Sequence, residues 1–508
     1  MTLQLLSAPP VAGPAQGFYD GPQLLRCAAP PLADPRKRGR RPQDVGFWLG
    51  TSNGEDVWVP VERPISLIGA TRAGKGWHFV IPFLTEYPGS IITTSTRPDN
   101  MIASAVCRAA WGPIYCFNPD GVGGYPHNVN WSAIEGCEIP KVARKRAATL
   151  VGASGLGGDN KDGVWATASG GILQALLHAA AVEGLTIEDV YRWSRNIQSA
   201  EQAINILLAG AQRRDDPLMD QWHLTLTAVQ ALEGRMQDSK WLGVEQALAP
   251  LHEYKVRRHF AHKPSDPGYF NTREFILNGG TVYMIANGSD STDDTAGTAG
   301  VFYSLFLDHV NDVTREVSQR NPDGRLVIPQ GLLLDELANI YAWKAAGRVM
   351  SAGAGEGVQE VAIFQTYEQS VDAYTRERAG VIRDNSMTIL LGNSKNAEYL
   401  QGIADLMPTR TVTETSRQVG GGLPLLGSTT HSTREVPGLT ADEIRRLPFG
   451  TAAILETSTR LMIVDLVRYH HRAHANCIKA SRAWHAAHPG QLLTSTVVPK
   501  GTTQWPLP

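Results

Sequence analysis

Residues 69–76 read G-A-T-R-A-G-K-G, a glycine-rich stretch in which Lys75 directly follows a glycine. In a G-x-x-x-x-G-K loop the backbone N–H groups surround phosphates, and the lysine reaches the β- and γ-phosphate oxygens. An apolar run precedes the loop and a helical pattern follows it, as this motif requires, whereas a plain glycine turn with a surface lysine needs neither. We predict that the whole loop contacts nucleotide phosphates: Gly69, Ala70, Thr71, Arg72, Ala73, Gly74, Lys75 and Gly76.

The residue after Lys75 departs from the usual motif. A Ser or Thr at this position would offer its hydroxyl to Mg²⁺, but the chain has Gly76. The metal could accept a water there and depend on an acidic residue elsewhere, because Mg²⁺ commonly keeps several waters. The loop therefore predicts nucleotide binding more directly than nucleotide hydrolysis.

An acidic pair follows a second apolar run. Residues 330–340 read QGLLLDELANI, so that Asp335 and Glu336 come at the end of a predicted buried strand. This placement predicts Asp335 in the shell of Mg²⁺ and Glu336 as the base that polarises an attacking water. Acidic pairs also follow strands without any function, and it is the upstream phosphate loop that favours the catalytic interpretation.

Gln365 ends a third apolar run, VAIFQTYEQ, and allows two interpretations. Its side chain could contact the γ-phosphate or orient water from the tip of a strand. It could equally cap the helix that follows.

Short apolar runs and helical patterns alternate around these motifs, which predicts an α/β fold with a central parallel sheet. Residues 51–56 (TSNGED) predict the turn of a hairpin, and the next strand, 65–68, leads directly into the loop. Further strands are expected within 89–96, 113–121, 279–288, 330–340, 358–370 and 387–395, helices at 97–111 and 298–317, and a last hairpin at 452–469.

Three segments differ from this alternation. Residues 132–260 have helical spacing and few strand signals, which predicts a mostly helical insertion. Residues 417–438 are rich in Gly, Ser and Thr and are expected to form a loop. Residues 1–43 are rich in Pro, Gly and Ala and contain the basic cluster PRKRGRR; they predict a flexible arm, either a solvated linker or a contact to acidic lipid or nucleic acid.

Composition limits the class of protein. The 508 residues allow two or three domains, and the formal net charge of −2 means that any nucleic-acid surface must be local. Five scattered cysteines without a Cys-x-x-Cys pair predict buried thiols rather than disulfides or a zinc site. No apolar run reaches the ~18 residues that span a bilayer, and the start lacks the order of a secretion signal, so a cytoplasmic chain is expected.

Seven stretches, in this order, resemble the type IV secretion coupling proteins, the conjugative DNA-transfer ATPases. They are GATRAGKGWHFVIPFL, IITTSTRPDN, IYCFNPDG, WLGVEQALAPL, LLLDELANI, IFQTYEQ and DEIRRLPFGTAAIL, and the resemblance runs from about residue 45 to about residue 469. In that family G-K-G is a familiar variant of the loop. The resemblance implies a RecA-like P-loop NTPase with an inserted all-α domain, and a ring, usually a hexamer, that uses ATP and Mg²⁺ to move single-stranded DNA with its relaxase.

The resemblance also implies roles for single residues. Lys75 would bind the phosphates, Asp335 the metal, Glu336 the water and Gln365 the γ-phosphate. An arginine finger would come from the neighbouring subunit, and the sequence leaves its identity open. The candidates are Arg348, Arg383 and Arg410.

Domain limits follow from the same comparison. A discontinuous nucleotide-binding domain would comprise 44–131 and 261–475, the all-α domain 132–260 would recognise relaxosome or substrate proteins, and 476–508 would form a tail. The expected partners include the secretion channel, at the inner face of the cell membrane. Family members usually have transmembrane helices ahead of the hairpin, so a membrane contact here would need a partner or an N-terminal anchor missing from the sequence.

Other residues allow simpler interpretations. His470, His471 and His474 could share a metal, but a solvated helix is the simpler expectation. The tryptophans of the helical segment, Trp165, Trp193, Trp222 and Trp241, are expected to be core residues rather than base-stacking platforms. Residues 255–263 (KVRRHFAHK) could line a DNA channel or form a charged surface.

Two other functions stay open at this stage. One is a double-strand DNA translocase for segregation or packaging. The other is a scaffold that binds nucleotide without hydrolysing it and recruits a relaxase; the absence of a hydroxyl at Gly76 is its support, and the acidic pair argues against it.

Overall fold

The computed structural model describes ten stretches of the chain. They are residues 42–153, 163–214, 217–232, 234–287, 300–340, 342–392, 395–406, 409–418, 428–456 and 461–493. Of the predicted arm, residues 1–41, which include the basic cluster, lie outside the described residues.

A single eleven-stranded sheet forms the centre of the molecule, in the order β2-β1-β13-β12-β9-β3-β8-β7-β4-β6-β5. From β9 to β5 all neighbours are parallel, and from β9 through β12, β13 and β1 to β2 they are antiparallel. The strands are β1 Gly46–Ser52, β2 Glu55–Pro60, β3 Ile65–Ile68, β4 Ser90–Ser95, β5 Ile114–Phe117, β6 Thr281–Ile285, β7 Gln330–Asp335, β8 Val358–Phe364, β9 Met387–Leu391, β12 Thr451–Leu455 and β13 Met462–Leu466. The predicted α/β class, the N-terminal hairpin and the strand before the loop are confirmed.

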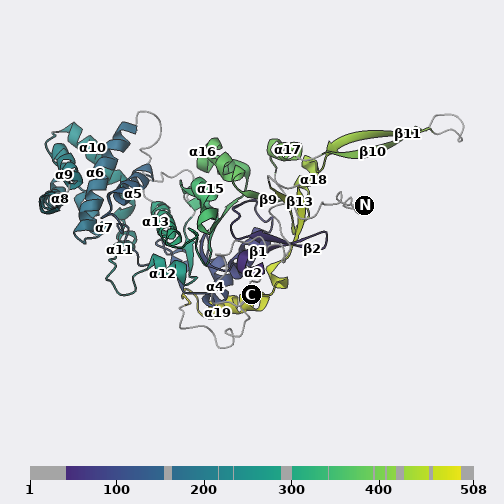
Figure 1. The fold of residues 1–508 in the computed structure, drawn as a ribbon, viewed down its shortest axis with the longest axis horizontal. Helices are drawn as coiled ribbons and strands as arrows, with labels where there is room; N and C mark the ends of the chain where they lie inside the picture. The colour runs from purple at the N-terminus through teal and green to yellow at the C-terminus, as the bar shows by residue number, and fades with distance from the viewer. Residues whose placement is uncertain are drawn as a thin grey trace.

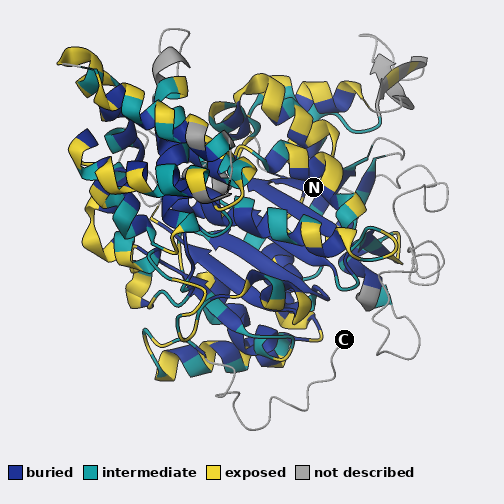
Figure 2. Ribbon diagram, turned by 60° about the vertical axis from the view of Figure 1, so that its left-hand side comes forward, coloured by how far each residue is buried: buried dark blue, intermediate teal, exposed yellow. Residues whose placement is uncertain are grey.

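Helices cover both faces of this sheet, and Figure 2 shows the strands as a buried layer between them. The helices along the sheet are α2 Pro42–Val45, α3 Ile81–Glu86, α4 Asp99–Ala109, α12 Thr272–Leu277, α13 Gly300–Gln319, α14 Leu337–Ile340, α15 Ala346–Glu356, α16 Tyr367–Asp384, α17 Ala397–Asp405, α18 Ala441–Arg445 and α19 Ala475–Ala487. Successive side chains of a strand point to opposite faces. In β7, accordingly, Leu333 belongs to one apolar cluster and Leu332 and Leu334 to another. Double burial explains why these strands read as continuous apolar runs.

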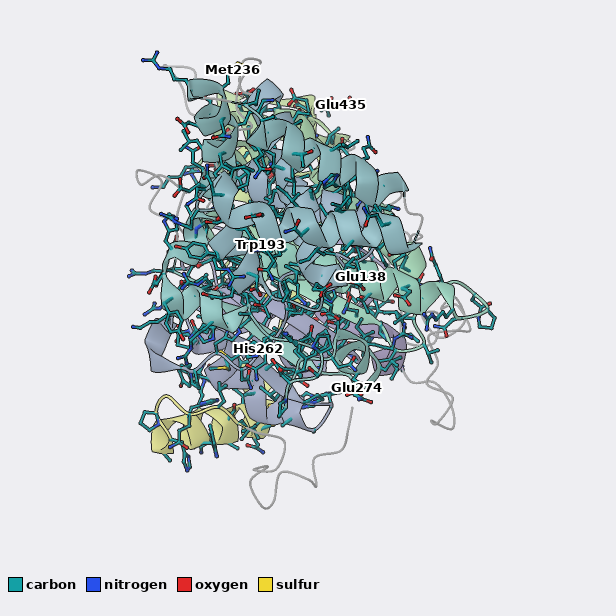
Figure 3. The ribbon with its side chains drawn as sticks, turned by 90° about the vertical axis from the view of Figure 1, so that its left-hand side faces the viewer. Glu138, Trp193, Met236, His262, Glu274 and Glu435 are labelled. Atoms are coloured by element: carbon teal, nitrogen blue, oxygen red, sulfur yellow. The ribbon has the colours of Figure 1, made fainter. Side chains whose placement is uncertain are left out.

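The described residues of 132–260 lie mostly in helices at one end of the molecule (Figure 1). These are α5 Pro140–Ala153, α6 Gly163–Val182, α7 Ile187–Trp193, α8 Glu201–Arg214, α9 Pro217–Gln230, α10 Arg235–Ala247 and α11 Tyr254–His259. Trp193, Trp222 and Trp241 are buried, as expected of core residues, while the side chain of Trp165 lies outside the described residues. Figure 3 faces this end and shows Trp193 among the helices and Met236 at their margin. The limits of a separate domain remain a prediction.

The expectation of a loop at residues 417–438 was wrong for the residues that the structure describes. Residues 417–438, expected as a loop, include the end of β10 Thr409–Gln418 and all of β11 Ser428–Pro437, which pair as an antiparallel ribbon. Figure 1 shows this ribbon projecting from the body. Thr and Val favour extended backbone, and both strands are rich in Thr, which outweighs the turn signal of Gly and Ser.

Two smaller observations complete the fold. Cys107, Cys116, Cys137 and Cys477 are buried free thiols. No helix among the described residues is both long and apolar enough to cross a lipid bilayer.

Candidate nucleotide-binding site

The glycine loop lies at the C-terminal edge of the parallel strands, between the ends of β8 and β9. The Gly69 N–H donates to the Phe364 carbonyl at the end of β8 over 3.0 Å, and the Ala73 N–H donates to the Ala70 carbonyl over 3.1 Å. A π-helical turn, Gly76–Val80, follows the loop and continues into α3. The helix predicted here therefore begins with a wider turn, and the loop is held by backbone bonds at both ends.

Two loop positions require unusual backbone conformations. Gly74 has φ = +91°, and a Cβ there would lie 2.6 Å from His78 Nδ1 and 2.9 Å from the Phe449 ring. A glycine is needed at this position both for its conformation and for space. Arg72 has φ = +65° although it is not a glycine, a conformation that costs about 1–2 kcal/mol and marks a constrained loop.

Lys75 lies between the loop and the acidic pair. Its Nζ donates to the Gly69 carbonyl over 2.8 Å, so the lysine closes the loop on itself. Burial lowers the pKa of the Lys75 ammonium, and the negative charges of Asp335 and Glu336 oppose that shift. The three side chains that were predicted to act together therefore lie within electrostatic reach of one another.

Asp335 ends β7 and has the properties of a metal ligand. Among the described residues its Oδ1 is buried without a hydrogen-bond partner, while its carbonyl accepts from Thr94 Oγ1 over 2.7 Å. Burial and, to a smaller extent, the charge of Glu336 raise the pKa of Asp335 to about 6, although the charge of Lys75 opposes the rise. A bound cation would lower the pKa of Asp335 again and stabilise its carboxylate. An orphaned hard oxygen beside a second carboxylate fits Mg²⁺.

Glu336 is held in a strained conformation beside Asp335. It has φ = +53°, and its carbonyl accepts from the Ile340 N–H over 3.2 Å at the start of α14. Its Oε2 accepts a hydrogen bond from Thr96 Oγ1. A non-glycine residue with left-handed backbone dihedral angles costs of order 1–3 kcal/mol of folding free energy, and such residues cluster at functional sites.

Thr94 and Thr96 are site residues that the sequence interpretation did not single out. Both lie at the C-terminal end of β4, the neighbour of β7, and both bond to the acidic pair. The signal was available in IITTST, because polar residues interrupt an apolar run at the point where the strand ends.

Gln365 directly follows β8 and contacts the loop. Its Oε1 accepts from Thr71 Oγ1 over 3.2 Å, and its backbone N–H donates to Gln369 Oε1 over 2.8 Å. The cap of the following helix is Thr366, whose hydroxyl accepts from the Gln369 N–H. The side chain of Gln365 therefore contacts the glycine loop, and the helix cap is Thr366. This geometry argues against the interpretation of Gln365 as a helix cap.

Gly76 is not required by packing. A Cβ built at this position meets no atom within 4 Å, and its φ is not in the left-handed region. Packing therefore does not explain why residue 76 lacks a hydroxyl, because the space around it would admit a serine.

The other predicted candidates do not join the site through any contact in the described part of the chain. Arg348 is exposed on α15, and Arg383 on α16 pairs with Asp384 over 3.0 Å. Arg410 lies on β10, with its side chain outside the described residues. No arginine finger is selected by these positions.

The histidine cluster differs from the expected solvated helix. His470 lies in a 3₁₀ turn, Tyr469–His471, and His474 is buried, so burial lowers the pKa of its imidazole. Within the described residues no group of three or more His, Cys, Asp or Glu side chains is placed to hold a metal ion.

The comparisons with known proteins agree with this architecture. A family profile described as the TraM recognition site of TraD and TraG matches residues 329–449. The unbound bacterial conjugative coupling protein TrwBdeltaN70 superposes with a TM-score of 0.55 at 16% identity, over 90% of this chain and 95% of that one. The plasmid coupling protein TrwB with ADP and Mg²⁺ gives 0.54 at 16%, over 90% and 96%. TrwB with a non-hydrolysable ATP analogue gives 0.54 at 17%, over 90% and 95%.

A search of curated protein sequences gives no match. The family profile and the shared fold confirm the resemblance that the sequence motifs indicate: this chain has the fold of the bacterial conjugative coupling proteins, and its residues 329–449 match the recognition site of TraD and TraG.

Proposed function

We propose that the chain is an ATP-hydrolysing coupling protein that recruits a relaxosome or another substrate and pumps single-stranded DNA into a type IV secretion channel. The observation that supports this function best is the meeting of Lys75 with Asp335 and Glu336 at one edge of the parallel sheet. A phosphate loop opposite an acidic pair is the arrangement that nucleotide hydrolysis needs.

The residues divide the work as follows. The backbone N–H groups of residues 69–76 hold the phosphates, and Lys75 exchanges the Gly69 carbonyl for the β- and γ-phosphate oxygens. Asp335 would hold Mg²⁺ when the ion is bound, and Gly76 would offer it no oxygen. Mg²⁺ supplies charge that offsets the negative charge on the transferring phosphoryl group.

Glu336 would activate the attacking water. Its carboxylate, oriented by Thr96, accepts a proton as the water attacks the γ-phosphate. Gln365, held against Thr71 of the loop, would contact the γ-phosphate and link its loss to the start of α16. This link is the route by which hydrolysis would move the helix.

The assembly completes the proposal. We expect a homo-hexamer in which Arg348, Arg383 or Arg410 of a neighbour supplies the finger. Residues 132–260 would be the all-α domain that recognises relaxosome proteins, and 44–131 with 261–475 the nucleotide-binding domain. The protein would work at the inner face of the cell membrane, in contact with channel components. A fragment of residues 132–260 should give a helical circular dichroism spectrum; a strand-rich spectrum would contradict these limits.

Steady-state ATP hydrolysis at high protein concentration, with and without single-stranded DNA, tests the function. Turnover that rises with DNA and disappears in Lys75→Ala would support a motor. Turnover that responds only to double-stranded DNA would favour a double-strand translocase. ATP binding without turnover under all conditions would favour the recruitment scaffold.

A further inference from the structure

An exposed aromatic cluster lies directly beside the glycine loop. Trp77 follows the loop and is 48% exposed, and Phe449, which precedes β12, is 50% exposed. Their ring centroids are 6.3 Å apart in an edge-to-face arrangement. The centroid of the exposed His470 ring also lies 6.3 Å from that of Trp77, again edge to face. Large apolar side chains seldom remain this exposed together without a binding role.

The cluster is presented by ordered backbone rather than by loose loops. Phe449 lies in a turn closed by the Thr451 N–H, which donates to the Pro448 carbonyl over 3.0 Å. Gly450 has φ = +94°, as such a turn requires, and its carbonyl accepts from the Leu466 N–H over 2.7 Å. The Phe449 ring is therefore held in the open by hydrogen bonds at its base.

Phe449 also packs against the loop itself. Its ring lies 4.9 Å from the buried His78 imidazole, whose Nδ1–H donates to the Gly74 carbonyl over 3.1 Å. The conformation of the glycine loop and the position of the aromatic cluster are thus coupled through one histidine.

Arg468 adds a positive charge to the cluster. Its guanidinium carbon lies 5.6 Å from the Trp77 ring centroid and 5.2 Å from that of Phe449. Arg468 is exposed and, in the described part of the chain, makes no ion pair. A cation with aromatic neighbours and no carboxylate is suited to an electron-rich, partly anionic ligand.

The topology places this cluster opposite the acidic pair. In the sheet order β12-β9-β3-β8-β7, Asp335 at the end of β7 lies two strands to one side of the loop strand β3. Phe449, at the start of β12, lies two strands to the other side. Because β12 runs antiparallel to β9, its start lies at the same sheet edge as the loop. A triphosphate with its γ end near the acidic pair would direct its base toward the cluster.

We propose that Trp77, Phe449 and Arg468 form the site for the base of a purine nucleotide, a proposal that rests on the function proposed for the loop. No aromatic ring of the described residues stacks flat on Trp77 or Phe449, and about half of each side chain is exposed, which leaves room for a base beside Arg468. Every base has a π-face, and stacking is therefore tolerant of base identity. The cluster should accept ATP and GTP with dissociation constants that differ by only a few-fold.

The test compares ATP with inorganic tripolyphosphate, which has the phosphates but no base. Dissociation constants for both ligands, with Mg²⁺, are measured by calorimetry on the full chain and on Phe449→Ala and Trp77→Ala. The expected result is a loss of ATP affinity of about tenfold, the size that stacking on one aromatic ring provides, with unchanged affinity for tripolyphosphate. Trp77→Phe should keep most of the ATP affinity.

Tyr254→Ala is the matched control, since Tyr254 is an aromatic residue 63% exposed on α11 and far from the loop in sequence. Unchanged ATP affinity in both alanine variants would overturn the proposal, and so would an equal loss for both ligands, which would indicate a disturbed loop. Failure of the unsubstituted chain to bind either ligand would instead refute the proposed nucleotide function itself.

Discussion

At the sheet edge that contains Lys75 and Asp335, two non-glycine residues, Arg72 and Glu336, have left-handed backbone, whereas the described residues of 132–260 contain none. The site also holds a buried carboxylate oxygen without a partner. The helical part instead uses regular capping: Thr186 caps α7 in a reciprocal box with Asp189, and Trp241 donates from Nε1 to the Ser194 carbonyl over 2.7 Å.

This difference separates two uses of folding free energy. The described residues of the helical part include no non-glycine residue with left-handed backbone, and its large buried tryptophans pack in the core. The sheet edge holds strained backbone and a buried carboxylate oxygen without a hydrogen-bond partner, two features that are typical of ligand-binding sites. Function and stability should therefore respond to different substitutions.

The largest effect expected at the sheet edge is that of Glu336→Gln. Removing a general base costs about 10²–10⁴-fold, so ATP turnover should fall by that factor while ATP still binds. Steady-state hydrolysis and equilibrium binding of the variant check both parts. Glu398→Gln on the exposed surface of α17 is the control and should leave both unchanged. Full turnover in Glu336→Gln would remove this residue from the mechanism.

The matching substitution in the helical part is Trp193→Ala. Trp193 is fully buried, and truncating such a side chain costs about 3–5 kcal/mol. Urea unfolding followed by far-UV circular dichroism should show the loss, while folded protein keeps its affinity for ATP. Met236→Ala, at a position 60% exposed, should change stability by less than about 0.5 kcal/mol. Loss of ATP affinity in folded Trp193→Ala would mean that the two regions are not independent.

A pH series sharpens the account of the unsatisfied charge. The folded-state pKa of Asp335 is raised to about 6, above its ordinary value. Ionisation of this group therefore destabilises the ligand-free fold as pH rises from about 4 to 6, the reverse of the usual carboxylate effect. Binding of Mg²⁺ needs the ionised form, so the affinity for Mg²⁺ and ATP should fall about tenfold from pH 7 to pH 5. Titration by calorimetry across this range measures it.

Asp335→Asn separates the two contributions. The variant should lose most of its Mg²⁺-dependent affinity and the pH dependence with it. Its melting temperature at pH 7, without nucleotide, should be higher than that of the unsubstituted chain. A lower melting temperature would show that the carboxylate stabilises the fold and that its charge is satisfied.

The sequence was sufficient for most of the sheet and for the residues that act along single strands. Apolar runs doubly buried between helices, such as β7 and β8, have a pattern that is visible in the chain. Lys75, Asp335 and Gln365 end or follow such runs, so their common edge could be expected. The structure adds that Gln365 contacts Thr71 rather than capping α16.

What the sequence could not provide depends on pairing between distant segments. Phe449 meets Trp77 only because β12 is inserted beside β9, an order that no local pattern specifies. Thr96 joins Glu336 because β4 neighbours β7. The β10–β11 ribbon was missed for a different reason, since Gly and Ser next to its strands resemble a loop.

The smallest effect is expected from adding the hydroxyl that the loop lacks. Gly76→Ser places an oxygen where the usual motif has one, and the space around Gly76 admits a Cβ without contact. The hydroxyl would replace one water of Mg²⁺, an exchange of similar ligands, so turnover should change by only about two- to fivefold. Steady-state hydrolysis and Mg²⁺ titration of the variant measure the change.

Gly76→Ala is the matched control, because it adds the same Cβ without an oxygen. If the serine variant alone gains Mg²⁺ affinity, the metal lies next to residue 76 and Gly76 is a variant that a water compensates. If serine and alanine behave alike, the metal shell does not reach this position, and Asp335 with Glu336 must hold Mg²⁺ from the β7 side alone. The contrast then extends within the loop itself, between a glycine fixed by packing at position 74 and one at position 76 that is free to change.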